Sequence, residues 1–162
     1  MPYTPIMAAL GYVLHPDGER VLMVLRSRDG DVHQGKYNGL GGKLEDDEDI
    51  VACLRRELHE EAGITVTAER LRGTISWPGF GNEGESWFGF IFAVDAFTGE
   101  VPDRNDDGPL HWVSSKDLLD GTLPLWGGDK NFLPLVFDDD PRAFHGVMPY
   151  DHGRPTGWSF HR

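Results

Sequence analysis

Apolar and polar residues alternate in short runs along much of the chain, and Gly, Pro and Asp fall between the runs. This pattern predicts half-buried strands joined by turns. The predicted strands are Pro5–His15, Val21–Arg26, Ile64–Ser76, Trp87–Val94 and Leu110–Val113, with an Asp17-Gly18 turn after the first. In the fourth strand Phe88, Phe90 and Phe92 alternate, which predicts one heavily buried face.

A second pattern, with helical spacing, places Ile50, Val51, Leu54 and Leu58 on one apolar stripe. The acidic run at residues 46–49 suits the N-terminus of this helix, because unpaired N–H groups and the helix dipole favour carboxylates there. Gly63 suits its C-terminal end. Two shorter helices are predicted at Ser115–Leu119, with Ser115 as the cap, and at Lys130–Phe137, where Pro134 limits or kinks the helix.

Loops are predicted where glycine, proline or acidic residues cluster: Ser27–Asn38, Trp77–Gly84 and Asp103–Pro109. The tail from Ala143 to Arg162 is expected to be mostly extended. Since strands and helices are interspersed, we expect an α/β (α+β) fold with a mixed sheet covered by helices, in one domain spanning residues 1–162.

Composition and charge narrow the functional class. With 39% hydrophobic and 11% aromatic residues, the chain is expected to fold rather than to be disordered. A net charge of −12 argues against an extended nucleic-acid surface but not against a small nucleotide substrate. A single cysteine, Cys53, excludes an intrachain disulfide and is expected to be a packing residue. Without a signal peptide or a spanning apolar run, the expected protein is cytoplasmic, has no membrane partner, and is a monomer or homodimer.

Three acidic residues near the end of the long helix point to metal chemistry. Glu57 lies three residues before Glu60 and four before Glu61, so their like charges repel. A hard cation removes this conflict, and magnesium prefers oxygen ligands shared with substrate phosphates. The simpler interpretation is a solvated helix face on which Arg55, Arg56 and Lys43 pair with the carboxylates.

The whole segment from Gly42 to Ile64 fits the pattern G-x5-E-x7-R-E-U-x-E-E-x-G-U, with U aliphatic. The specified positions are Gly42, Glu48, Arg56, Glu57, Leu58, Glu60, Glu61, Gly63 and Ile64. This string resembles the Nudix box. The resemblance implies a Nudix hydrolase with an α-β-α sandwich, which uses Mg²⁺, or Mn²⁺ in its place, to cleave a nucleoside diphosphate linked to another group.

The resemblance also implies roles for individual residues. Glu57, Glu60 and Glu61 would hold metal together with the carbonyl of Gly41, which lies in a glycine-rich loop. Asp107, five residues before Trp112, would be a further metal-site acid or the general base; Asp106 and Glu60 are the alternatives, and either aspartate could be an ordinary loop acid. Arg56 would orient a glutamate, whereas Glu48 would be structural.

The substrate is suggested by similarity outside the box. Residues 36–45 resemble the corresponding segment of MutT-type oxidised-purine nucleoside triphosphatases, and Leu125–Asp129, Phe132–Pro134 and Phe144–Gly146 follow in similar order. Carried over from those enzymes, the base-binding residues would be Asn38, Trp126 and Asp129. Gly128 is a departure, because it replaces the first of two aspartates, and Trp126 could instead be a core anchor.

Other functions are compatible with the same box. ADP-ribose hydrolases often have a proline near the position of Pro78, which lies 14 residues after Ile64. A nucleotide sugar or a capped or triphosphorylated RNA end is therefore an alternative substrate. A nucleotide-binding sensor is the non-enzymatic alternative, although the intact acidic set favours catalysis.

Overall fold

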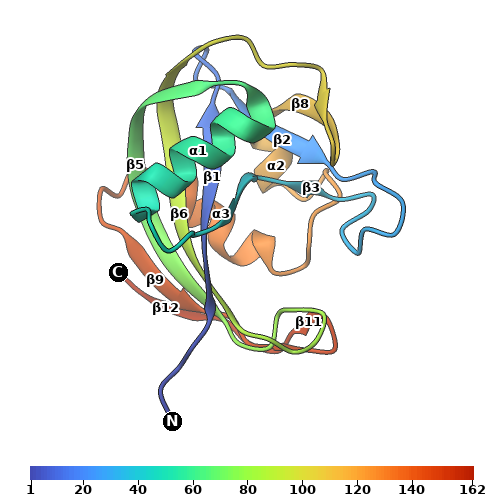
Figure 1. The fold of residues 1–162 in the computed structure, drawn as a ribbon, viewed down its shortest axis with the longest axis vertical. Helices are drawn as coiled ribbons and strands as arrows, with labels where there is room; N and C mark the ends of the chain where they lie inside the picture. Colours follow the sequence, from blue (N-terminus) through green and yellow to red (C-terminus); the bar gives the residue numbers. More distant parts are fainter.

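A ten-stranded mixed sheet forms the body of the protein (Figure 1). The computed structural model describes all 162 residues. The strands are β1 (Ile6–Leu14), β2 (Arg20–Leu25), β3 (Tyr37–Asn38), β4 (Leu40–Lys43), β5 (Thr65–Trp77), β6 (Trp87–Thr98), β7 (Arg104–Asn105), β8 (Gly108–Ser114), β9 (Phe144–Val147) and β12 (Ser159–His161). Their order is β12-β9-β5-β6-β1-β2-β8-β7, with β3 added to β2 and β4 to β1. Two further strands, β10 (Tyr150–Asp151) and β11 (Arg154–Pro155), form a separate hairpin.

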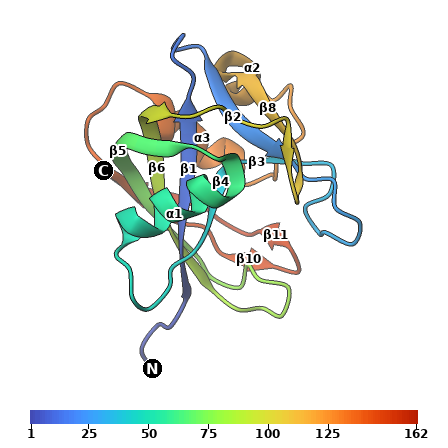
Figure 2. The same cartoon turned by 45° about the horizontal axis from the view of Figure 1, so that its top comes forward.

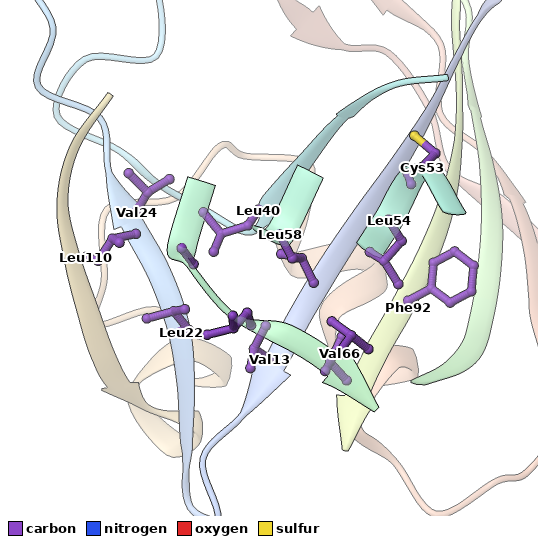
Figure 3. Packing of buried hydrophobic residues seen from close by; sticks show 14 residues of the cluster. Val13, Leu22, Val24, Leu40, Cys53, Leu54, Leu58, Val66, Phe92 and Leu110 are labelled. Carbon is purple, nitrogen blue, oxygen red and sulfur yellow. The ribbon is translucent and has the colours of Figure 1, made fainter. Parts of the chain in front are cut away.

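Helices cover both faces of this sheet, which gives the α-β-α sandwich predicted from the sequence (Figures 1 and 2). Helix α1 (Ile50–Ala62) packs on one face, where its Leu54 and Leu58 meet Val13 of β1 and Phe92 of β6 in a buried cluster (Figure 3). Helices α2 (Ser115–Leu119) and α3 (Asp129–Phe137) pack on the other face, with Phe132 in the second cluster. None of the three helices is long and apolar enough to cross a membrane.

The predicted apolar stripe and C-terminal glycine of α1 are confirmed, but the acidic run ends before the helix begins. Asp49 is the N-cap, and its carboxylate accepts a hydrogen bond from the N–H of Ala52 at 2.8 Å. The preceding acids therefore lie in the loop that leads to the helix rather than in its first turn. Gly63 ends the helix with φ of 66°, a left-handed conformation that glycine adopts without strain. Cys53 is buried, and burial raises the pKa of its thiol to about 11, as expected of a packing residue.

The strand predictions hold, with shifts of a few residues at the ends. β6 differs in one respect: it is buried on both faces, because Ile91 belongs to the cluster with α3, while Phe92 and Val94 belong to the cluster with α1. Phe88 and Phe90 are only half-buried.

Two of the predicted loops and the glycine-rich loop that contains Gly41 hold short strands, which local sequence did not reveal because the hydrogen-bond partners are distant in the chain. Residues 37–38 pair with β2, residues 104–105 pair with β8, and the glycine segment forms β4 against β1. The cap of α2 was also misplaced: Ser115 is its first residue, and Ser114 precedes it without a side-chain capping bond.

Candidate active site

Arg56 holds three acidic side chains along one edge of α1. Its Nη2 and Nε donate to the two oxygens of Glu48 at 2.7 and 2.9 Å. Its Nη1 donates to Glu57 Oε1 at 2.8 Å and to Glu60 Oε2 at 3.4 Å. The guanidinium lowers the pKa of Glu48 to about 2. Glu48 thus forms an ion pair that joins the loop before α1 to the helix, and Arg56 fixes the direction in which Glu57 points.

Glu57 and Glu61 lie against the backbone of β4. The N–H of Gly41 donates to Glu61 Oε2 at 3.3 Å. The carboxylate of Glu57 fills the space beside Gly42, where an added Cβ would lie 2.4 Å from its carboxyl carbon. Burial, followed by the charge of Glu57, raises the pKa of Glu61 to about 8. Gly42 therefore lets Glu57 come close to the strand, where Glu57 and Glu61 form a pair of mutually repelling carboxylates.

Asp107 faces these glutamates from the turn between β7 and β8. Its Oδ1 lies 3.7 Å from Arg26 and 3.8 Å from Arg28. Asn105 ties the turn to the helix, since its Nδ2 donates to the carbonyl of Glu61 at 3.2 Å and its Oδ1 accepts from the N–H of Asp107 at 2.9 Å. Together the turn and the helix enclose a polar cleft of about 520 Å³ whose acidic lining is Glu57, Glu60, Glu61, Asp106 and Asp107.

The acidic side chains share this cleft without converging on one point. No group of three or more His, Cys, Asp or Glu side chains is arranged closely enough to hold a metal ion. Glu57 and Glu60 turn their oxygens toward Arg56 instead. The side chain of Glu60 is 58% exposed, so its rotamer can change on a nanosecond timescale.

A second cavity, of about 350 Å³, brings together Asn38, Trp126 and Asp129. These residues come from β3, from the loop before α3, and from the start of α3. Aromatic residues complete the walls: Tyr12, Trp77, Phe80, Trp87, Phe132 and Tyr150. Trp126 therefore lines a cavity rather than anchoring the core. We call this cavity the aromatic pocket.

The polar groups of the aromatic pocket are poorly paired. The Nδ2 of Asn38 is buried and has no hydrogen-bond partner. Burial raises the pKa of Asp129 to about 7, against the opposing effects of the Trp126 backbone N–H and the charge of Lys36. A polar ligand would form hydrogen bonds with both groups, the unpaired N–H of Asn38 and the carboxyl group of Asp129, whose pKa is about 7.

Trp126 is positioned by His33. The indole Nε1 donates to His33 Nδ1 at 2.7 Å, so that nitrogen must be unprotonated. Burial and the charge of Arg26 lower the pKa of His33, which favours the neutral ring. Lys36 lies over the Trp126 ring, with Nζ 5.3 Å from its centroid.

Comparison with known proteins identifies the family. A sequence model of the NUDIX domain matches residues 4–136. The chain belongs to the Nudix hydrolase family.

The relatives of this Nudix hydrolase include enzymes acting on nucleotides. It is 32% identical over 134 residues to an oxidized purine nucleoside triphosphate hydrolase of Danio rerio, covering 83% of this chain and 81% of that protein. It is 28% identical over 142 residues to an uncharacterized Nudix hydrolase of Bacillus subtilis, and the match covers 85% of this chain and 83% of that protein. The crystal structure of a MutT protein from Bacillus halodurans superposes with a TM-score of 0.81 at 26% identity, covering 96% of this chain and 97% of that one. The protein is thus a Nudix pyrophosphohydrolase whose fold binds nucleotides.

Several residues of the Nudix site were not predicted from the sequence. His33 supports Trp126, Arg26 bridges Asp31 at 2.7 Å and Asp107 at 3.7 Å, and Tyr150 reaches the aromatic pocket from the tail. They come from a loop, a strand end and a hairpin that carry no recognisable motif.

The structure also gives a physical reason for Gly128, the departure from the MutT-type pattern. A Cβ at this position would lie 2.4 Å from Met148 Sδ and 2.8 Å from Tyr150 Oη. The tail therefore occupies the space that a side chain at position 128 would need.

Pro78 lies beside the aromatic pocket without lining it. Its carbonyl accepts a hydrogen bond from the Tyr150 N–H at 2.8 Å. This bond fixes the β10–β11 hairpin next to the loop that joins β5 and β6, as Figure 2 shows. Between hairpin and loop lies a further cavity of about 650 Å³, which shares His33, Phe80, Trp87, Trp126 and Tyr150 with the aromatic pocket.

Proposed function

We propose that this Nudix hydrolase converts a purine nucleoside triphosphate, best an oxidised guanine nucleotide, to the monophosphate and pyrophosphate. The observation that carries the proposal is the junction between the two sites. Gly41 and Gly42 line the aromatic pocket, and they also contact Glu61 and Glu57, respectively. A base in the pocket would therefore place its phosphates at the carboxylates.

The aromatic pocket suits a purine. Trp126 offers an aromatic face, while Asn38 and Asp129 offer polar groups to the edge of the base. A wrong base would leave these buried groups unpaired, at a cost of roughly 1–3 kcal/mol for each group. This penalty gives the site a physical means of choosing among bases.

The carboxylates have the chemistry to hold a divalent cation, although in this structure they do not converge on one point. Glu57 and Glu61 are crowded and shielded from water, and the raised pKa of Glu61 reflects that unfavourable burial of like charge. We propose Glu57, Glu60, Glu61 and the carbonyl of Gly41 as the groups that would hold Mg²⁺, with Mn²⁺ as a substitute. When bound, the cation supplies positive charge for the diphosphate and acidity for a water ligand.

Further polar residues of the cleft would activate the attacking water. Glu60 and Asp107 both line the cleft, and either could accept the proton of the water. Arg26 and Arg28 balance the charge of Asp107, and Arg56 keeps Glu57 directed. The water oxygen would bond to the α- or the β-phosphorus as the P–O bond that bridges them breaks, which gives the monophosphate and pyrophosphate.

ADP-ribose, another nucleotide sugar, or a capped or triphosphorylated RNA end is the second candidate substrate class. The 650 Å³ cavity beyond the aromatic pocket favours it, because a substrate with a second bulky group could extend there. Its lining includes the acidic Glu85 and Asp151, which argues against a phosphate in that space.

Hydrolysis in ¹⁸O-labelled water tests the proposed reaction. We expect 8-oxo-dGTP to give monophosphate and pyrophosphate in equal amounts, with the label in one of these two products, and no turnover in excess chelator. Release of inorganic phosphate as the first product, or full turnover in chelator, would contradict the proposal.

A further inference from the structure

Tyr150 places an unused hydroxyl in the aromatic pocket. It is the only residue after α3 that lines this pocket. Its ring meets Phe80 edge to face, with centroids 5.0 Å apart. The hydroxyl makes no hydrogen bond within the protein; burial and the charge of Asp129 raise its pKa to about 12. The group therefore stays protonated at physiological pH and is free to bond a ligand.

The backbone around Tyr150 holds this hydroxyl in position. The Tyr150 N–H donates to the carbonyl of Pro78 at 2.8 Å, and Tyr150 pairs with Pro155 across the β10–β11 hairpin. The approach of the two segments is close, because a Cβ on Gly79 would lie 2.8 Å from the Tyr150 carbonyl oxygen. A side chain anchored at its backbone and packed at its ring loses little further entropy when it binds a ligand.

Gly128 makes room for the hydroxyl. It is buried at the start of α3, next to Asp129, and any side chain there would collide with Met148 and Tyr150. The missing side chain at position 128 thus leaves the space that the phenol of Tyr150 occupies. The polar group at this wall of the pocket belongs to Tyr150.

We infer that Tyr150 is a specificity-determining residue whose O–H donates a hydrogen bond to an oxo group of the purine. The inference rests on the proposed function and adds to it the residue that selects the base. Asn38 Nδ2 is a second unpaired donor in the same pocket. Two donors match a base that carries carbonyl oxygens, whereas adenine presents an amino group at the six position. Burial, followed by the nearby charge of Asp129, raises the pKa of Tyr150 and keeps the proton on the phenol, so the hydroxyl can donate.

Tyr150→Phe tests the inference, because it removes the hydroxyl and keeps the ring packed on Phe80. We would measure kcat/KM for 8-oxo-dGTP, dGTP, dITP and dATP in the 162-residue protein. The 8-oxo-dGTP/dGTP ratio reports on the eight-position oxygen and the N7 proton that accompanies it, and the dITP/dATP ratio reports on the six-position oxygen and the N1 proton that accompanies it. At least one ratio should fall about tenfold, the size of one hydrogen bond, and the ratio that falls shows which edge of the base meets Tyr150. Tyr3→Phe is the matched control, since its hydroxyl bonds Ser76 Oγ at 2.6 Å outside the pocket.

Calorimetric binding of dGMP, dIMP and dAMP provides a second measurement that needs no turnover. Gly128→Ala should weaken the same preference as Tyr150→Phe, because its methyl group displaces the phenol. Both ratios within twofold of wild type in Tyr150→Phe would overturn the role of Tyr150 while leaving the proposed function intact. A wild-type protein that neither cleaves these triphosphates nor binds the monophosphates would overturn the proposed function and this inference together.

Discussion

Asp129 should make the stability of the protein depend on pH in a direction opposite to that of most carboxylates. Its side chain sits at the start of α3, inside the aromatic pocket, and burial raises its pKa from 3.8 to about 7. The folded state therefore binds the proton more tightly than the unfolded state. The resulting stabilisation is fully present below pH 3.8, falls as the pH rises, and is lost above about pH 7.

The size of this effect follows from the same values. The difference between a pKa of 3.8 in the unfolded state and about 7 in the folded state corresponds to roughly 4 kcal/mol of unfolding free energy, at about 1.4 kcal/mol per pKa unit. About 2 kcal/mol of this change lies between pH 5.5 and pH 8.5, where such a protein can be studied in solution. Because Asp129 is not completely buried and water reaches the pocket, we expect about 1–2 kcal/mol.

Asp129→Asn removes the titration with little change in shape. Unfolding by urea at pH 5.5 and 8.5 gives the free energy of unfolding of the variant and of wild type. The variant should gain about 1–2 kcal/mol relative to wild type between the two pH values. Asp139→Asn, at an exposed position, should follow wild type. A difference between Asp129→Asn and wild type that is independent of pH would refute the reasoning.

Three further predictions concern the carboxylates and the support of Trp126. Glu60→Gln and Glu61→Gln should each lower turnover at least a hundredfold while far-UV circular dichroism stays unchanged; wild-type turnover in the double variant would contradict their role. Millimolar Mg²⁺ should raise the melting temperature by binding the native state, and Glu57→Gln should weaken that shift; equal shifts in both proteins would argue against a site at Glu57. His33→Ala should raise KM for nucleotides about tenfold, whereas His33→Asn, which keeps an acceptor near the Nδ1 position, should raise it less; equal KM values in the two variants would mean that the bond to Trp126 does not position the indole.

The parts of the site that lie within one helix and its flanking loop could be predicted from the sequence. The spacing of Glu57, Glu60 and Glu61 is fixed by the helix itself, and Gly63 ends that helix for a local reason. Such features depend on residues close together in the chain, so a pattern along the sequence records them.

The parts that depend on distant segments could not be predicted in the same way. The glycine segment resembles a loop in sequence, yet it forms β4 because β1 lies beside it. His33 and Tyr150 approach Trp126 and Asp129 only after the loop and the tail have packed. The sequence shows only that position 128 carries no side chain. Its cause, the tail that fills the space, required the structure.

The most direct test of the central claim is kcat/KM of the wild-type protein for 8-oxo-dGTP, dGTP and ADP-ribose, measured with Mg²⁺. The aromatic pocket, with its unpaired Asn38 donor and its neighbouring carboxylate cleft, predicts that 8-oxo-dGTP is the best of the three. If ADP-ribose is preferred by tenfold or more, equivalent to about 1.4 kcal/mol of transition-state stabilisation, the site is built for a nucleotide sugar and the proposed substrate is wrong.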